Sequence, residues 1–170
     1  MASHPDRSCL SPTWTVSPIR YDDPSVQPLL LQLHAAQVQM YGFADHPTDT
    51  PADDYSPPNG FFLLGRDASR QAAGCGGWRL LAPRTAEIKR MYVRPDARGK
   101  SLGRQILLRL EADAQLHEVT HIQLETGVAN LAALCLYRSH GYQPIEPYRA
   151  GRNPAVNRAL RKTLQGTLAP

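Results

Sequence analysis

Apolar residues recur at intervals of three and four in three segments of the chain, the spacing that places them on one face of a helix. These segments are residues 26–43, 102–114 and 131–140. Pro28 is compatible with the first helix, because proline is tolerated in the first turn. Gly141 is expected to end the third, since glycine readily adopts the left-handed conformation found after a helix C-terminus. The pattern therefore predicts three helices.

Seven shorter segments show the alternation or the brief apolar run that is typical of strands. They are residues 14–21, 61–64, 72–81, 86–93, 122–126, 142–145 and 156–164. Within residues 86–93 the even-numbered and the odd-numbered positions each include polar residues. Because successive side chains of a strand point to opposite faces, polar groups are expected on both faces of this strand. Residues 44–60 hold prolines and four aspartates, and they predict a long loop that is too polar and too broken for a core element.

Strands with helices interleaved among them predict one α/β (α+β) domain on a mixed, mostly antiparallel sheet. The length of 170 residues suits a single domain, which we expect to span residues 13–165. Residues 1–12 contain no apolar block, so we expect a loose leader there rather than a secretory signal. No apolar run approaches the roughly 18 residues of a membrane span, and we expect a cytoplasmic protein without a membrane partner.

The net charge of +4 and the pI of about 9.1 suit an anionic ligand but are modest for a nucleic-acid-binding protein. Five basic residues gather near the C-terminus with Tyr148 as the one aromatic residue beside them. We interpret them as the charged outer face of the last strand and expect no nucleic-acid partner. They are Arg149, Arg152, Arg158, Arg161 and Lys162.

Neither the cysteines nor the histidines have the spacing of a metal site. Cys9, Cys75 and Cys135 form no C-x-x-C pair, which indicates reduced and mostly buried thiols. Residues 117–121 read H-E-V-T-H, the pattern of a zinc-protease helix, yet they straddle a predicted helix end and run into a strand. Because zinc chemistry needs both histidines on one face of a continuous helix, we expect no metal.

The segment 98–104, R-G-K-S-L-G-R, joins a predicted strand to a predicted helix. Its small residues let the backbone approach a ligand, and the free N–H groups at the helix start attract phosphate. Arg98, Lys100 and Arg104 add full positive charges. The segment is not a P-loop, because that motif needs glycine at the position of Arg94. We therefore expect a phosphate-binding turn, although a plain basic helix start remains the alternative.

Two blocks of this sequence resemble the GCN5-related N-acetyltransferase (GNAT) family. The first reads M-Y-V-R-P at residues 91–95 and continues as R-x-x-S-x-G at 98–103. The second reads N-x-x-A-x-x-x-Y-x-x-x-G-Y at residues 130–142. Ser101 replaces the central glycine of the family's cofactor signature. Phosphate contact should survive this change unless the backbone there needs a positive φ.

The resemblance implies a central sheet that splays between its fourth and fifth strands, with acetyl-CoA bound in the gap as co-substrate. The pantetheine arm would pair with the backbone of the fourth strand, and the pyrophosphate would lie on the turn. The residues implied in cofactor binding are Met91, Tyr92, Val93, Arg98, Gly99, Lys100, Ser101, Leu102, Gly103, Arg104 and Asn130. Dimers are common in the family, so a homodimer is possible.

Acetyl transfer to a primary amine needs a base for the amine and an acid for the leaving thiolate. The resemblance points to Glu87 as the base, directly or through water, with Glu125 as the fallback and a structural ion pair as the alternative for Glu87. It points to Tyr137 as the acid, with core packing as the alternative. The backbone N–H of Val93 is the expected donor to the thioester oxygen.

The acceptor is the least defined part of this prediction. We expect a small-molecule amine or an amino acid, with a protein N-terminus or lysine as the alternative. A non-catalytic acyl-CoA sensor is the alternative from another functional class. The four aspartates of residues 44–60 could attract a cationic amine, whereas Arg79, Arg90 and Tyr92 could hold a carboxylate.

Overall fold

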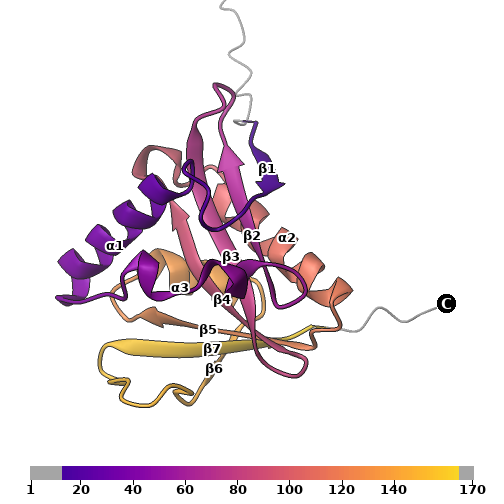
Figure 1. The fold of residues 1–170 in the computed structure, drawn as a ribbon. Helices are drawn as coiled ribbons and strands as arrows, with labels where there is room; N and C mark the ends of the chain where they lie inside the picture. Colours follow the sequence, from indigo (N-terminus) through magenta and orange to yellow (C-terminus); the bar gives the residue numbers. More distant parts are fainter. Residues whose placement is uncertain (1–12, 165–170) are drawn as a thin grey trace, which may run out of the picture.

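The computed structural model describes residues 13–164, which form a seven-stranded sheet with helices on both faces (Figure 1). The predicted leader, residues 1–12, lies outside the described residues. The strands are β1 (Thr15–Pro18), β2 (Gly60–Arg66), β3 (Ala72–Ala82), β4 (Thr85–Val93), β5 (His121–Gly127), β6 (Gln143–Ile145) and β7 (Asn157–Thr163). Their order is β1-β2-β3-β4-β5-β7-β6, and every neighbouring pair is antiparallel except β4–β5. The predicted mixed, mostly antiparallel sheet is confirmed.

The three predicted helices are present as α1 (Gln27–Tyr41), α2 (Leu102–Leu116) and α3 (Leu131–Ser139). The end of α1 follows from its sequence, because Gly42 takes φ 80° and donates its N–H to the Val38 carbonyl at 2.8 Å. Buried leucines of α1 join one apolar cluster, and those of α2 and α3 join a second cluster on the opposite face of the sheet. The sheet is therefore covered on both sides.

Residues 44–60 connect α1 to β2 and include two short 3₁₀ turns, Pro47–Asp49 and Ala52–Tyr55. The predicted long loop is present, and it contributes one residue to the core, Tyr55, which is 2% exposed. The Tyr55 ring stacks on Tyr21 at 4.7 Å between centroids. The Tyr21 hydroxyl in turn donates to the Pro47 carbonyl at 2.7 Å. Aromatic stacking thus anchors this polar loop to the core.

Strands β4 and β5 separate soon after they meet. Their parallel pairing covers only Thr85–Glu87 of β4 against His121–Gln123 of β5. The remaining six residues of β4 and the last four of β5 have no partner across this seam. The predicted splay between the fourth and fifth strands is therefore confirmed, and it leaves backbone N–H and C=O groups free to bind a ligand.

A β-bulge at Arg90 changes which side chains share a face of β4. Cys75 pairs with Tyr92 and Gly77 pairs with Lys89, so Arg90 and Met91 of β4 together oppose the single residue Gly76 of β3, and Arg90 has φ 60°. After the bulge, Met91 and Val93 pack with Ile88 on the α2 face, while Tyr92 joins the α1 cluster. The predicted even–odd alternation is thus wrong beyond Lys89, because one extra residue reverses the two faces.

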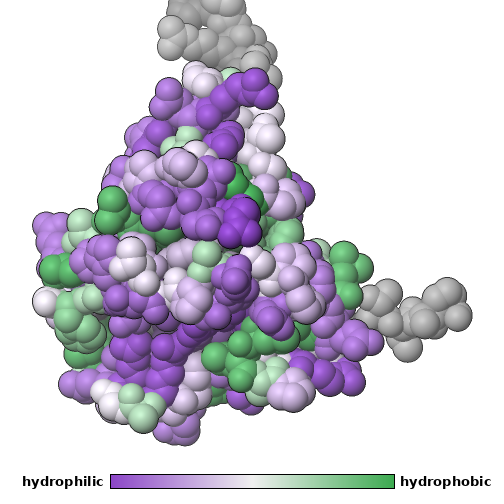
Figure 2. All heavy atoms as spheres, in the orientation of Figure 1, coloured by the Kyte–Doolittle hydropathy of each residue, from purple (hydrophilic) through white to green (hydrophobic). Residues whose placement is uncertain are grey.

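The surface of the described part is largely hydrophilic, with apolar side chains in small separate patches on the face that Figure 2 shows. Within residues 13–164, no helix has the length and apolar character needed to cross a bilayer.

Candidate functional site

The gap between β4 and β5 opens into a cavity of about 460 Å³ bounded by α1, α3 and the start of α2. All but one of the residues predicted to bind the cofactor line it, and so does Tyr137. Those residues are Met91, Tyr92, Val93, Arg98, Gly99, Ser101, Leu102, Gly103, Arg104 and Asn130. Lys100 is the exception, since its Nζ donates to the Asp96 carbonyl at 2.9 Å. The fold thus brings two sequence blocks, 91–104 and 130–137, to one cavity.

The turn before α2 is built by two residues in the left-handed region. Gly99 has φ 71° and Ser101, the N-cap of α2, has φ 64°. Serine therefore occupies a conformation that glycine adopts without strain, at a cost of about 1 kcal/mol. The Arg98 Nε donates to the Val93 carbonyl at 2.9 Å, and its guanidinium lies 5.8 Å from the Tyr92 ring centroid. These contacts hold the turn against the end of β4.

Tyr137 lies on the cavity side of α3 and is 5% exposed. Its ring packs edge-on against Tyr142, with 5.5 Å between the ring centroids. Burial raises the pKa of Tyr137, so the hydroxyl keeps its proton at neutral pH. Asn130 has a structural role in the same region, because its side chain caps α3 by accepting the Ala133 N–H at 3.3 Å.

Glu87 is 1% exposed, and both of its carboxylate oxygens are engaged. Arg149 donates from Nε at 3.1 Å and from Nη2 at 2.6 Å, Tyr148 donates at 2.9 Å, and Arg79 donates from Nε at 3.2 Å. Burial alone would raise the pKa of Glu87, but the positive charges of Lys89 and Arg149 outweigh it and hold that pKa below its usual range. Glu87 is thus a carboxylate at neutral pH and joins β4 to the loop before β7.

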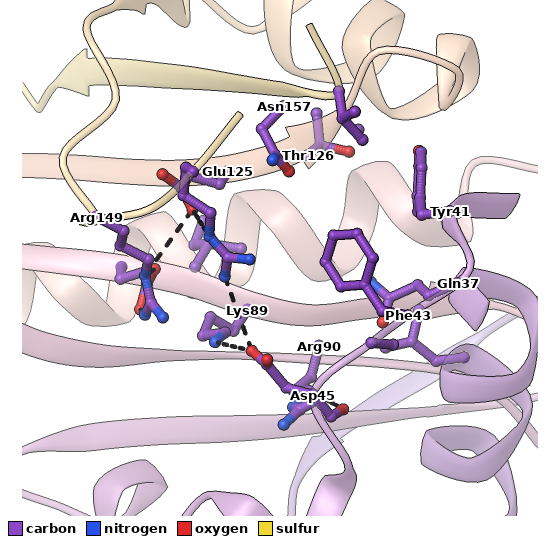
Figure 3. A pocket seen from close by; sticks show the side chains of 17 residues that line it. Gln37, Tyr41, Phe43, Asp45, Lys89, Arg90, Glu125, Thr126, Arg149 and Asn157 are labelled. Atoms are coloured by element: carbon purple, nitrogen blue, oxygen red, sulfur yellow. Dashed lines mark hydrogen bonds and ion pairs between the residues drawn. The ribbon is translucent and has the colours of Figure 1, made fainter. Parts of the chain in front are cut away.

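A second, smaller cavity of about 130 Å³ adjoins the first (Figure 3). Lys89, Arg90 and Glu125 line both cavities and mark their junction, whereas Glu87 lines only the smaller one. Figure 3 shows Lys89 and Asp45 pointing toward one another, and their charged atoms lie 3.7 Å apart. Burial lowers the pKa of Lys89 to about 8.

Glu125 differs from Glu87 in its partners. Its Oε2 accepts a hydrogen bond from Arg152 Nε at 3.0 Å, but its buried Oε1 has no partner within the described part of the chain. Burial raises the pKa of Glu125, and the nearby arginines only partly oppose that effect. The two glutamates at this site therefore have pKa values shifted in opposite directions.

Sequence reasoning missed the role of two arginines. Arg149 and Arg152 lie in the loop between β6 and β7 and reach Glu87 and Glu125, so their interpretation as the outer face of the last strand is wrong. Periodicity could not find them, because they belong to no regular element. The one sequence feature that could have indicated their role is that both arginines lie close to Tyr148.

The residues proposed from sequence to hold a carboxylate are occupied by other contacts. Arg79 binds Glu87 and Asp54, and the Tyr92 hydroxyl lies 3.3 Å from the Gln32 side-chain oxygen. The Nη atoms of Arg90 donate to the carbonyls of Asp45 and His46 and to the Thr50 hydroxyl.

The histidines and cysteines are placed as follows. His117 is the C-cap of α2 and His121 begins β5, so the H-E-V-T-H pattern does straddle a helix end. Among residues 13–164, no three His, Cys, Asp or Glu side chains form a group that could hold a metal ion. Cys75 is buried as predicted, whereas the prediction of burial is wrong for Cys135, which is exposed on α3.

The sequence model of the acetyltransferase (GNAT) family matches residues 30–142. Because this match covers more than half of the chain, the protein belongs to the GNAT acetyltransferase family.

Curated relatives agree with this assignment. An uncharacterized N-acetyltransferase of Schizosaccharomyces pombe is 34% identical over 63% of this chain and 65% of its own length. The IAA acetyltransferase of Azospirillum brasilense is 37% identical over 51% of this chain and 59% of its own. The chain thus spans less than two thirds of either relative.

Among solved structures, a Klebsiella pneumoniae protein assigned as an acyl-CoA N-acyltransferase is 28% identical, with a TM-score of 0.77. That match covers 90% of this chain and 99% of the Klebsiella chain.

Proposed function

We propose that this protein is an acetyl-CoA-dependent N-acetyltransferase that acts on the primary amine of a small molecule. The observation that carries the proposal is the cavity of about 460 Å³ where β4 and β5 separate, because the turn before α2 and Tyr137 both line it. Membership of the GNAT family and the acetyltransferase names of the relatives support the proposal. The small volume of the adjoining cavity, about 130 Å³, supports a small acceptor.

In this reaction the neutral amine attacks the thioester carbonyl. A C–N bond forms, the C–S bond breaks, and coenzyme A leaves as a thiolate. An alkylamine with a pKa of about 10.4 is protonated at neutral pH, so a proton must first leave it. The backbone N–H of Val93 is the proposed donor to the thioester oxygen as that oxygen gains charge.

Tyr137 is the proposed acid that returns a proton to the thiolate. It faces the cofactor cavity, and its raised pKa ensures that the proton is present. Its ring also packs on Tyr142, so the core-packing role and the acid role are compatible at one residue.

Glu87 is the proposed base, acting directly or through water, with Glu125 as the alternative. The ion pairs of Glu87 make it a weak base, since a lowered pKa reduces its affinity for a proton. Glu125 has the raised pKa and the unpaired oxygen that suit proton acceptance, and it lies where the two cavities meet. Comparison of Glu87→Gln and Glu125→Gln in the pH dependence of kcat distinguishes the two.

The direct test is an acceptor screen that follows release of the coenzyme A thiol and identifies the acetylated product by mass. We expect amine-dependent release, together with saturable binding of coenzyme A. Arg104→Gln should weaken that binding, whereas Arg158→Gln, a change at an exposed residue of β7 that lines neither cavity, should not. Binding without turnover across the panel would identify an acyl-CoA sensor instead, and absence of binding would refute the cofactor.

A further inference from the structure

The smaller cavity carries an excess of positive side chains whose hydrogen-bonding capacity is not used up. Four cations line it, Lys89, Arg90, Arg149 and Arg152, against the three carboxylates of Asp45, Glu87 and Glu125. Glu87 is already neutralised by Arg149 on one side and Arg79 on the other. An anion entering this cavity would therefore meet a net positive charge in a partly desolvated place.

Arg152 offers the best-placed donors for such an anion. Its Nε is held by Glu125 at 3.0 Å, which fixes the direction of the guanidinium. Its Nη2 lies 3.8 Å from Asp45, beyond hydrogen-bond distance, and the side chain is 25% exposed. The two terminal nitrogens thus make no hydrogen bond to a residue between 13 and 164. A planar fork of this kind matches a carboxylate in a bidentate geometry.

Glu125 brings a hydrogen-bond acceptor and a negative charge next to Arg152, whose Nε it binds. Its side chain is 9% exposed, and its Oε1 is a buried acceptor without a donor among the described residues. An unmet carboxylate oxygen is costly, so a ligand that brings an N–H donor there is favoured. Because Glu125 lines both cavities, a donor at this point lies where the smaller cavity adjoins the one proposed for acetyl-CoA.

We infer that the acceptor is an aminocarboxylate, with its carboxylate bound by Arg152 and its amine directed to Glu125. This assignment rests on the proposed acetyltransferase function and narrows it to one substrate class. Arg149 assists with its charge, since only its Nη1 remains free of the hydrogen bonds to Glu87. Binding of both charged ends orients the nitrogen toward the junction of the cavities, which favours attack on the thioester.

The size of the cavity limits the acceptor as well. Its volume of about 130 Å³ is well below the roughly 460 Å³ of the adjoining cavity, so it suits a small acceptor. The aminocarboxylate end of the acceptor is the part that we place there, beside Arg152 and Glu125, which both line this cavity.

The test compares sets of three acceptors: an α-amino acid, its carboxamide, and the amine that lacks the carboxyl group. For the wild-type protein we expect kcat/KM for the amino acid to exceed that for the carboxamide by tenfold or more, the worth of a charged hydrogen bond. Arg152→Gln should abolish this ratio, Arg152→Lys should reduce it, and the control Arg158→Gln should leave it unchanged. Because the ratio compares acceptors within one variant, an effect of the Arg152 change on Glu125 that alters all rates equally does not alter the ratio.

Equal rates for all three acceptors in the wild-type protein would overturn the inference while leaving the acetyltransferase function in place. So would an Arg152→Gln variant that slows all three acceptors by the same factor. If no amine is acetylated at all, the proposed function fails and the inference fails with it. Melting curves of each variant with coenzyme A establish that a lost ratio reflects the site rather than unfolding.

Discussion

Replacement of Glu87 by Gln separates the structural role of this buried residue from its proposed catalytic role. The change keeps the shape of the side chain but removes its charge, and one acceptor oxygen becomes an NH₂ donor that faces arginine donors. Arg149 and Arg79 then lose their shared counter-charge, although their side chains are 25% and 19% exposed.

Breaking a buried ion pair by removing one partner costs about 3–5 kcal/mol. Because water reaches both arginines, we expect the low end, about 3 kcal/mol of the free energy of unfolding. For a chain of this size that corresponds to a fall in Tm of about 6–12 °C. The pKa of Glu87 is lower in the folded state, so its contribution is present above the unfolded pKa of about 4.3 and is lost as the pH falls through the folded pKa.

The assay is urea unfolding at pH 7 and at several lower pH values, with Glu146→Gln as the control. Glu146 is exposed, so its change should alter stability by less than about 0.5 kcal/mol. A Glu87→Gln protein as stable as that control would refute the reasoning from the ion-pair network. If Glu87 is also the base, the folded variant loses kcat mainly near neutral pH; an unchanged shape of the pH–rate profile removes it from the mechanism.

Three further changes test other parts of the site. Tyr137→Phe keeps the ring packed on Tyr142, so it should lower kcat without weakening coenzyme A binding, measured by kinetics and calorimetry; full activity would mean that Tyr137 only packs. Ser101→Gly should raise the unfolding free energy by up to about 1 kcal/mol, because relief of the φ of 64° outweighs the added flexibility of the unfolded chain; a loss of stability in urea would contradict this. Lys89→Met should stabilise the fold below pH 8 by at most about 3 kcal/mol. The folded pKa of about 8 lies below the unfolded value, so the unfolded chain binds more protons between pH 8 and about 10.4, and wild-type stability rises across that window. The difference in the free energy of unfolding between Lys89→Met and the wild type should therefore vanish by about pH 10.4. A difference that does not change with pH would show that the lowered pKa of Lys89 is not its cause.

Much of the fold was predictable because it depends on local patterns. Three segments follow local rules of periodicity, capping or turn formation, and the structure forms the expected helix, strand or turn at each place. They are the helical segment before Gly42, the strand at residues 122–126 and the turn at residues 98–104. The cofactor-binding role of that turn stays a prediction, which rests on its small and basic residues at a helix start.

The sequence by itself determined the helices, the strands, the family and the turn before α2, because those depend on residues that are close together along the chain. Tertiary structure alone decided the character of the smaller cavity. Arg152 contacts Glu125, which lies 27 residues away in the sequence, and Arg149 contacts Glu87, which lies 62 residues away. The periodicity of apolar and polar residues does not predict such contacts. The bulge at Arg90 likewise depends on the register of β4 against β3. Burial raises the pKa of Glu125, whereas the charges of Lys89 and Arg149 outweigh burial and lower the pKa of Glu87, and both effects act through space rather than along the sequence.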